Sequence, residues 1–361
     1  MQYTKESKIM NFEKFEQHLN GIDAKSKPIG FGVHHFLLHF NSTFSQSGEK
    51  LFTEFLSSFS YVKKWIIASD YVFGDRKKPN DTVVFSIIPY LANLNDINHT
   101  INGMAPTDIK KTKRVTDEFL KFLSDGPVFN ICIQLDRQRK LYTDEREYHR
   151  SKIESIISQL EYWCESTPEG RSGYLQSIKK FRNAAKLMQS PGINLKTFRD
   201  IEVVSTLAAY LMAKTASTID IEFISWLSDR DAMLDFKTDK LGHYMLDCTR
   251  YLYHSLCVNC GVNNHGKALF GLPEREGKMW YDSINRIPDL LAGTFADYEY
   301  ELNKLSHKKY VPIVEKLFSA EKRNLFFRID FNPKLKSSRL TWSAKHDVVA
   351  EDSISIETSA K

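Results

Sequence analysis

The chain has 361 residues, of which 42% are hydrophobic, 26% charged and 12% aromatic. This is the composition of an ordinary globular protein, and it excludes a collagen-like, disulfide-scaffold or fully disordered chain, while the length allows one large domain or two of ordinary size. Lysine and arginine number 50 against 45 acidic residues, and a surplus that small does not by itself indicate nucleic-acid binding.

The first part of the chain is expected to contain helical and extended segments followed by a strand pair. Residues 1–27 are polar with a helical pattern, residues 32–40 are expected to be extended, and a short helix is expected over residues 48–59. Residues 61–68 and 82–90 are rich in β-branched and aromatic residues and are bounded by polar turns, which is typical of strands. The two strands are close enough in the sequence to form an antiparallel hairpin with a rather long loop.

Helices and strands alternate in the middle of the chain. A lysine-rich helix is expected over residues 107–124, with Thr107 as its N-cap, and a strand over residues 128–135. A later strand is expected over residues 219–227, followed by a helix over residues 241–256. The region between these strands comprises predicted helices over residues 143–165, 172–189 and 200–215. This alternation predicts an α/β fold.

The end of the chain is rich in charge. Beyond about residue 266 the pattern is helical, with breaks at glycine and proline, up to roughly residue 325. Residues 304–345 carry eleven basic and three acidic residues, and they are expected to form a basic arm. The last sixteen residues hold four acids and one lysine and are expected to form a mobile acidic tail.

Cysteine usage and hydropathy bear on the cellular compartment. The five cysteines are odd in number and widely spaced, which favours reduced thiols in a cytoplasm. The N-terminal segment has scattered charges and no apolar block, so a signal peptide is not expected. The longest near-apolar stretch, residues 203–213, is about half as long as a membrane span. We therefore expect a cytoplasmic protein without a membrane partner.

Three predicted strands run directly into aspartates, namely Asp70, Asp136 and the pair Asp229 and Asp231. Ligands gather at strand ends in α/β sheets, because loops there present side chains without disturbing the core. A further acid, Asp247, lies on the polar face of the helix that follows the last of these strands. Carboxylates that meet at adjacent strand ends repel one another, and Mg²⁺ or Mn²⁺ relieves the repulsion because these cations prefer carboxylate oxygen.

Each of these aspartates also has a structural interpretation. Asp after a strand commonly starts a turn or caps a helix. Asp136 either belongs to a metal site or merely ends its strand. Asp229 and Asp231 compete for one role, since side chains two residues apart along an extended chain point the same way. The order of all these residues together favours a shared site.

The order of these features resembles the ribonuclease H-like fold: a strand ending in Asp, a hairpin, a basic helix, a strand, a long helical insertion, a strand ending in Asp and a helix carrying Asp. Over about residues 60–260 the chain is similar, more narrowly, to a divergent bacterial family of that fold with uncharacterised function, found near defence and mobile-element genes. The motifs that carry this similarity are Ser69-Asp70, Asp108-Ile109-Lys110, Asp229-Arg230-Asp231 and His243 to Asp247.

The resemblance implies a ribonuclease H-like mixed sheet with helical additions at both ends. The expected divisions are an N-terminal extension over residues 1–59, a ribonuclease H-like core over residues 60–265 with a helical insertion over residues 143–215, a helical C-terminal region with the basic arm over residues 266–345, and the acidic tail over residues 346–361.

The resemblance also implies metal-assisted hydrolysis of phosphodiester bonds in nucleic acid, in antiviral defence or a mobile element. Two Mg²⁺ or Mn²⁺ ions would clamp the scissile phosphate. The residues implied as ligands are Asp70, Asp108, Asp229 or Asp231, and Asp247. The residues implied to contact phosphates are Lys110, Lys111, Lys113 and Arg114. A solvated helix face is the alternative for this basic cluster, and the basic arm is a second candidate for nucleic acid.

Other chemistry has little support in the sequence. Cys257 and Cys260 have the spacing that opens a zinc knuckle, but the fourth ligand would fall at Phe270, so zinc is not expected. No Walker A loop, dinucleotide fingerprint, G-x-S-x-G or H-E-x-x-H motif is present. Three classes of function are left open: a metal-dependent nuclease, a non-catalytic ribonuclease H-like subunit that binds nucleic acid or a protein, and a nucleotide-processing enzyme with the same metal site.

Overall fold

The structure is a computed structural model that describes residues 33–107, 111–262, 266–272, 279–341 and 349–350. Its centre is a mixed seven-stranded sheet with the strand order β5-β4-β1-β2-β3-β7-β8. The strands are β1 (Lys64–Val72), β2 (Asp81–Pro89), β3 (Phe129–Leu135), β4 (Phe223–Ser228), β5 (Lys267–Phe270), β7 (Asn324–Asp330) and β8 (Lys336–Leu340). A small second sheet pairs β6 (Lys304–Leu305) with β9 (Val349–Ala350). The chain therefore has an α/β fold.

Strands β1, β2 and β3 form an antiparallel meander, which confirms the predicted hairpin. The register places Asp70 opposite Val84 and Val84 opposite Cys132. On the other side of β1, strand β4 pairs in parallel, and β5 pairs in parallel with β4. Beyond β3, strand β7 pairs in parallel and β8 closes that edge antiparallel to β7. The carboxyl ends of β1 and β4 are consequently neighbours, and we refer to this end of the strands as the edge at which the site lies.

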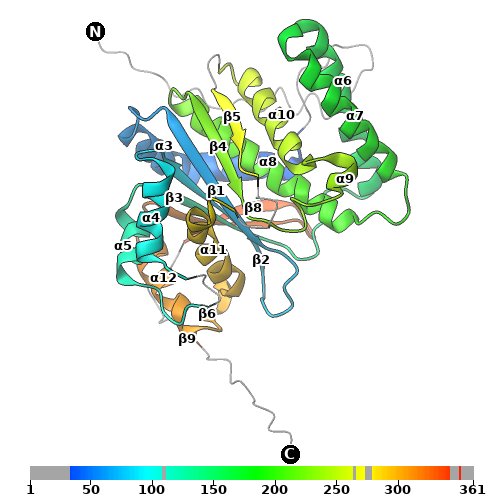
Figure 1. Ribbon diagram of the computed structural model, residues 1–361. Coiled ribbons are helices and arrows are strands. Elements are labelled where there is room, and N and C mark those ends of the chain that lie inside the picture. Colours follow the sequence, from blue (N-terminus) through cyan, green and yellow to red (C-terminus); the bar gives the residue numbers. More distant parts are fainter. Residues whose placement is uncertain (1–32, 108–110, 263–265, 273–278, 342–348, 351–361) are drawn as a thin grey trace, which may run out of the picture.

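Helices cover both faces of the sheet (Figure 1). Each face packs against its own hydrophobic core, and we call the face with the larger core the larger face and the other the smaller face. The helices on the larger face are α2 (His35–Ser47), α3 (Glu49–Ser58), α6 (Glu145–Ser166), α7 (Arg171–Met188), α8 (Leu195–Thr218), α9 (Thr238–Leu241) and α10 (Tyr244–Asn259). Those on the smaller face are α4 (Leu94–Met104), α5 (Asp117–Asp125), α11 (Asp282–Asp297) and α12 (Val311–Ile313). Short 3₁₀ or π turns lie at Pro168–Gly170, Tyr300–Leu302, Lys308–Tyr310 and Val314–Phe318. Among the described residues, no helix has both the length and the apolar character needed to cross a bilayer.

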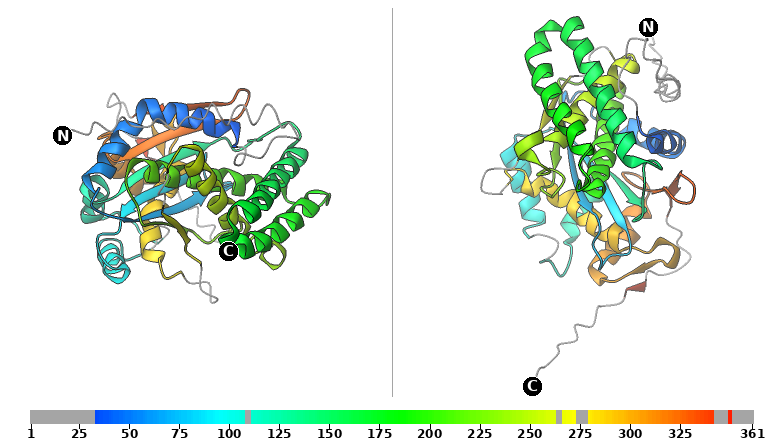
Figure 2. Two further views of the ribbon diagram at one scale, coloured as in Figure 1. Left: turned by 90° about the horizontal axis from the view of Figure 1, so that it is seen from above. Right: turned by 90° about the vertical axis from the view of Figure 1, so that its right-hand side faces the viewer.

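The strands are buried on both faces, which explains their nearly continuous apolar sequence. In β1, Trp65 and Ile67 pack into the core of the larger face, whereas Ile66 and Ala68 pack into the core of the smaller face. Helix α8 is buried along most of its length and supports the larger face. The long helices α6 and α7 pair and extend away from the sheet (Figure 2).

Residues 32–40 are not extended, because helix α2 begins at His35. Phe36, Leu37, Phe40 and Phe44 recur at helical spacing and are all buried, so they form one apolar face of that helix. The expectation of an extended segment was wrong because a short apolar run cannot by itself distinguish a strand from a buried helix. The predicted helix within residues 1–27 lies outside the described residues.

The lysine-rich helix is shorter than expected. Helix α5 begins only at Asp117, and residues 111–116 are not helical. Thr116, rather than Thr107, is the N-cap, and its hydroxyl accepts the Phe119 N–H at 3.2 Å. Acidic residues in the first turn favour a helix start at this point.

The region beyond residue 266 is not purely helical, and residues 304–345 do not form a separate arm. Strand β5 forms one edge of the central sheet, and β7 and β8 extend the opposite side. In β7, Leu325, Phe327 and Ile329 alternate into the larger core. The charged residues around them led to the prediction of a basic arm, although the segment is a buried strand. Most of the predicted acidic tail lies outside the described residues.

Candidate active site

Asp70 lies near the end of β1, on the face that α11 covers. Strand alternation places it on the same side as Ile66 and Ala68, which pack into the smaller core. Only 6% of the residue is exposed. Its Oδ1 accepts the backbone N–H of Tyr71 at 2.6 Å. Asp70 is therefore a nearly buried carboxyl group at the sheet edge where two parallel strands end.

Asp229 lies beside Asp70. It directly follows β4, and its backbone N–H donates to the Ser69 carbonyl at 2.9 Å. This bond continues the parallel pairing of β1 and β4, in which Ser69 is opposite Ser228. The next residue of each strand, Asp70 and Asp229, therefore lies on the same face. The sequence-based expectation that strand ends bring these two carboxylates together agrees with the structure.

The third carboxylate comes from α11 and was not identified from the sequence. The side chain of Asp289 forms a hydrogen bond with that of Asp70. One turn earlier on α11, buried Asn285 orients its amide to donate to the Leu227 carbonyl at 3.3 Å and to accept the Asp229 N–H at 3.2 Å. We call Asp70, Asp229 and Asp289 the acidic triad. The only signal for Asp289 in the sequence was an acid on a predicted helical segment.

The environment of the acidic triad raises the pKa of Asp70 well above its usual range. Burial is the largest cause, and the negative charges of Asp229 and Asp289 together with the hydrogen bond to Asp289 act in the same direction. The Tyr71 N–H opposes them by stabilising the carboxylate. Like charges this close resist joint ionisation, so the site favours binding a proton or a cation.

In the part of the chain that the structure describes, no three His, Cys, Asp or Glu side chains are arranged as ligands of one metal ion. The charges of Asp229 and Asp289 nevertheless act on Asp70. A hydrogen bond between two carboxyl groups turns oxygens of Asp70 and Asp289 toward each other, whereas metal ligands point toward a common centre. The side chains have the right chemistry for a hard cation but not the arrangement of a loaded site.

Asp247 does not join the triad, which corrects its predicted placement. It lies on α10, which packs on the larger face, whereas α11 covers the smaller one. Its carboxylate accepts Lys180 Nζ at 2.7 Å and lies 3.5 Å from a guanidinium nitrogen of Arg250. Asp247 therefore forms an ion pair between α7 and α10. The helical spacing correctly placed it on a polar face, but that face contacts another helix.

Asp136 is also remote from the triad. The register places Asp70 level with Cys132 of β3, two strands away, and Asp136 lies four residues further along the chain. Its carboxylate accepts the backbone N–H groups of Phe331 at 2.6 Å and Asn332 at 3.1 Å. Its role in the fold is thus to join the ends of β3 and β7.

Asp231 stabilises the turn after β4, which is the structural role expected of an aspartate that follows a strand. Its Oδ1 accepts the N–H groups of Met233 at 2.8 Å and Leu234 at 3.2 Å. Burial raises the pKa of Asp231 to about 6, although these two hydrogen bonds lower it. The negative charges that act on Asp231 are those of Asp200 and Asp235, whereas those that act on Asp70 are those of Asp229 and Asp289. Of this pair, only Asp229 faces Asp70.

The remaining predicted residues lie around the segment between α4 and α5. Asp108 and Lys110 are outside the described residues. Lys111, Lys113 and Arg114 line a pocket whose other wall includes residues of α11. They are therefore located near the helix that carries Asp289, although they are not themselves on a helix.

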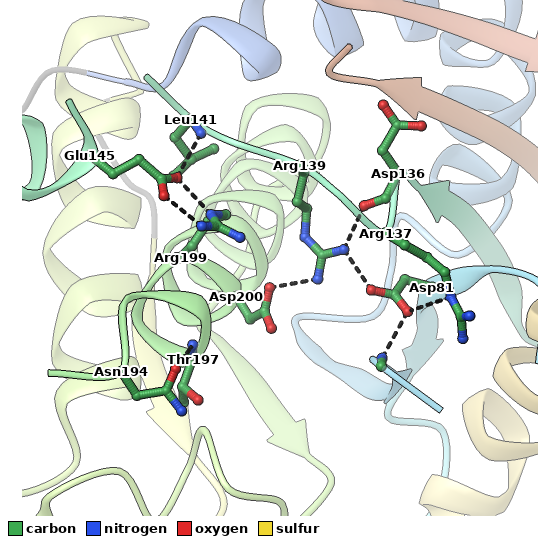
Figure 3. Close-up of polar contacts among 11 residues, drawn as sticks. Asp81, Asp136, Arg137, Arg139, Leu141, Glu145, Asn194, Thr197, Arg199 and Asp200 are labelled. Carbon is green, nitrogen blue, oxygen red and sulfur yellow. Dashed lines mark hydrogen bonds and ion pairs between the residues drawn. The ribbon is translucent and has the colours of Figure 1, made fainter. Parts of the chain in front are cut away.

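A buried ionic network lies near this edge on the other face of the sheet (Figure 3). The Arg139 guanidinium donates to Asp81 Oδ2 at 2.7 Å and to Asp200 Oδ1 at 2.5 Å, and it lies 4.6 Å from the centre of the Phe73 ring. Figure 3 shows the Asp136 carboxylate pointing away from this network. The contacts connect β2, the loop after β3 and α8.

No family model, curated protein or solved structure matches the chain. Its function is therefore inferred from the geometry of the site and from the sequence.

Proposed function

We propose that the chain is a metal-dependent, nuclease-like protein that hydrolyses phosphodiester bonds of nucleic acid, with the acidic triad as its catalytic centre. The observation that carries this proposal is the meeting of three carboxyl groups from β1, the end of β4 and α11. Burial and like charge raise the pKa of Asp70 there. Carboxyl groups with perturbed pKa values at strand ends are common features of active sites.

The donor set is suited to Mg²⁺ or Mn²⁺, because all three side chains offer only carboxylate oxygen. Asp70, Asp229 and Asp289 would hold the cation, which when bound supplies charge stabilisation for the phosphate and lowers the pKa of water. Asn285 orients Asp229 through its backbone N–H. Protons would compete with the cation for the carboxyl oxygens of Asp70 and Asp289, so cation binding is expected to weaken as the pH falls.

The order of elements supports a ribonuclease H-like relationship. A hairpin with Asp70, a third antiparallel strand, a helical insertion, a parallel strand ending before Asp229 and later helices follow one another along the chain. Apart from the basic helix, which the structure does not contain at residues 111–116, this order matches the one on which the sequence resemblance rests, with Asp289 in place of Asp247 as the helical acid. The resemblance is also the basis for proposing a role in prokaryotic defence or in a mobile element.

The second candidate function is a non-catalytic subunit of the same fold that binds nucleic acid or a protein partner. The observation in its favour is that the described side chains are not arranged as ligands of one metal ion. Such a subunit would keep the fold and the basic surface, and the raised pKa of Asp70 would keep that carboxyl group protonated in place of a bound cation.

The test uses the full chain with labelled single- and double-stranded DNA and RNA, titrated with Mn²⁺ or Mg²⁺. We expect cleavage by the wild type and a loss of at least about 100-fold in Asp70→Asn and Asp289→Asn, since even outer residues of metal sites contribute 10- to 100-fold. Asp125→Asn is the matched control, because this exposed acid lies on α5 over the same face. Calorimetric titration of Mn²⁺ provides a readout independent of cleavage.

The outcomes separate the candidates. Cleavage that persists in both triad variants would contradict the catalytic assignment. Strand binding without cleavage or Mn²⁺ binding, in protein whose circular dichroism is that of a folded chain, would favour the non-catalytic subunit.

A further inference from the structure

A cavity of about 280 Å³ lies between the segment that follows α4, the start of α5 and one side of α11. Its lining residues come from residues 104–107 and 111–116, from Phe119 of α5, and from Arg286 and Leu290 of α11. We call this cavity the basic pocket. Its volume lies just below the usual range of ligand sites, about 300–1,000 Å³, so it suits the base of one nucleotide rather than a large ligand.

The walls of the basic pocket are chemically divided. Apolar side chains form much of its surface, including Met104, Val115, Phe119 and Leu290. The described lining residues include three lysine or arginine side chains from 111–114 and no aspartate or glutamate. An apolar interior beside a cationic rim is complementary to a ligand that joins a flat, weakly polar ring to a phosphate.

The basic side chains around the rim differ in whether they already bind other groups of the protein. Arg286 donates to the Asn102 side chain and to the Ala105 carbonyl, so it mainly holds the wall in place. Arg114 pairs with Asp117 at 3.1 Å, and both side chains are largely exposed. Lys111 and Lys113 are exposed at the rim. These two lysines are therefore the main candidates for contacting a phosphate.

The basic pocket and the acidic triad share helix α11. Leu290 faces the pocket, and its neighbour Asp289 faces Asp70. Successive side chains of a helix diverge by about 100°, so the two sites lie on adjacent sides of a helix about 10 Å across. That separation corresponds to roughly three stacked nucleotides at about 3.4 Å each. One strand could therefore reach both sites.

We propose that the basic pocket binds one nucleotide of a single-stranded nucleic acid, with the base against the apolar wall and its phosphate at Lys111 and Lys113. A base must leave its stack to enter such a cavity, which favours a single strand over a duplex. Held there, the strand presents a nearby phosphodiester bond to Asp70 and Asp289. This role in positioning rests on the proposed function, but binding in the pocket can be measured without cleavage.

The experiment measures fluorescence anisotropy of labelled 12-nucleotide single-stranded DNA and RNA and of a 12-base-pair duplex with the full chain in EDTA, across a salt series. For the double variant Lys111→Glu/Lys113→Glu we expect at least about tenfold weaker single-strand binding at 0.1 M salt and a logarithmic salt slope reduced by about 2. Ala105→Trp should fill the pocket and weaken binding without changing the slope. The matched control is Lys179→Glu/Lys186→Glu, two exposed lysines of α7.

Three outcomes would overturn the inference: pocket variants that bind like the wild type, an equal loss in the α7 control, or tighter binding of the duplex than of either strand. Thermal melting verifies that each variant is folded. Asp289→Asn keeps the basic pocket, so it should bind strands normally even when cleavage is lost. If the wild type does not cleave nucleic acid but the pocket variants bind strands weakly, the proposed function is refuted and the pocket is not. If the wild type cleaves but the pocket variants bind strands normally, the pocket is refuted and the proposed function is not.

Discussion

Buried ionisable side chains outside the acidic triad gather between α6, α8 and the start of α2. His34 Nε2 lies 2.9 Å from Glu202 Oε2, and Lys152 pairs with the same carboxylate. His34 Nδ1 shares a hydrogen bond of 2.8 Å with the Tyr148 hydroxyl. Burial lowers the pKa of His34 to about 3, so its imidazole is neutral at physiological pH. These four side chains therefore bind one another, which is how buried polar groups avoid a large desolvation cost.

His149 differs from its neighbours in this cluster. It is fully buried, and neither ring nitrogen has a hydrogen-bond partner among the described residues. Its ring packs edge-on against Phe198, with centroids 4.9 Å apart. Burial lowers the pKa of His149 to about 4, while the charges of Glu202 and Lys152 act in opposite directions.

This burial makes the free energy of unfolding depend on pH. Below pH 6.5 the unfolded chain protonates His149 and the folded chain does not, so stability falls as the pH decreases from 6.5 to about 4. The contribution is on the order of 3 kcal/mol. In His149→Phe this part of the pH dependence should be absent, as measured by urea unfolding at several pH values. His39→Gln, at an exposed position of α2, is the control; parallel stability curves for wild type and His149→Phe would contradict the prediction.

Buried ion pairs connect several elements that are far apart in the sequence. Arg139 is 1% exposed and joins Asp81 at the start of β2 to Asp200 near the start of α8. Burial raises the pKa of Asp200, and the positive charge of Arg139 opposes that effect. On the same side, Arg199 of α8 pairs with Glu145 at the start of α6 (Figure 3). The helical insertion is thus held to the sheet by charges that are shielded from solvent.

Removal of Arg139 should therefore have a large effect. Arg139→Leu leaves Asp81 and Asp200 buried without a counter-charge, and we expect the free energy of unfolding to fall by about 3–5 kcal/mol. The matched control is Arg150→Leu, because Arg150 pairs with Glu147 on the surface of α6 and exposed pairs contribute about 0–1 kcal/mol. Urea unfolding at pH 7 measures both, and similar losses in the two variants would refute a special role for the buried network.

At the scale of the whole molecule, the two ends of the described chain pack together on the larger face. Phe327 of β7 lies edge-on to Phe40 of α2, with centroids 5.3 Å apart, and its ring is 5.9 Å from that of Phe44. All three side chains are essentially unexposed. Strand β7 also covers the side of β3 that would otherwise be an edge. The C-terminal region is therefore part of the central fold.

Phe327→Ala tests this closure. Loss of a fully buried phenylalanine typically costs about 3–5 kcal/mol, and we expect a loss of that size here, together with earlier proteolytic cleavage near α2. Tyr61→Ala is the control, since that ring is 70% exposed. A loss no greater than that of the control, by urea unfolding, would show that the C-terminal strands contribute little to the core.

Local sequence was sufficient for the elements that depend on neighbouring residues. The hairpin of β1 and β2, the strand β3 and the helical insertion follow from composition and turn residues within short windows. The proximity of Asp70 and Asp229 also followed, because parallel strands that end together place their next residues at the same edge. The α/β class of the fold was determined in the same way.

Only the tertiary structure decided which helix completes the site and which strands complete the sheet. Asp247 and Asp289 both lie on helices after β4, but α10 packs on one face of the sheet and α11 on the other. No local sequence pattern predicts the face of the sheet on which a helix packs, because that depends on contacts between apolar surfaces that are far apart in the sequence. The same reason applies to β7, whose place beside β3 requires pairing between residues nearly 200 positions apart, and β8 follows β7 into the sheet as its antiparallel neighbour.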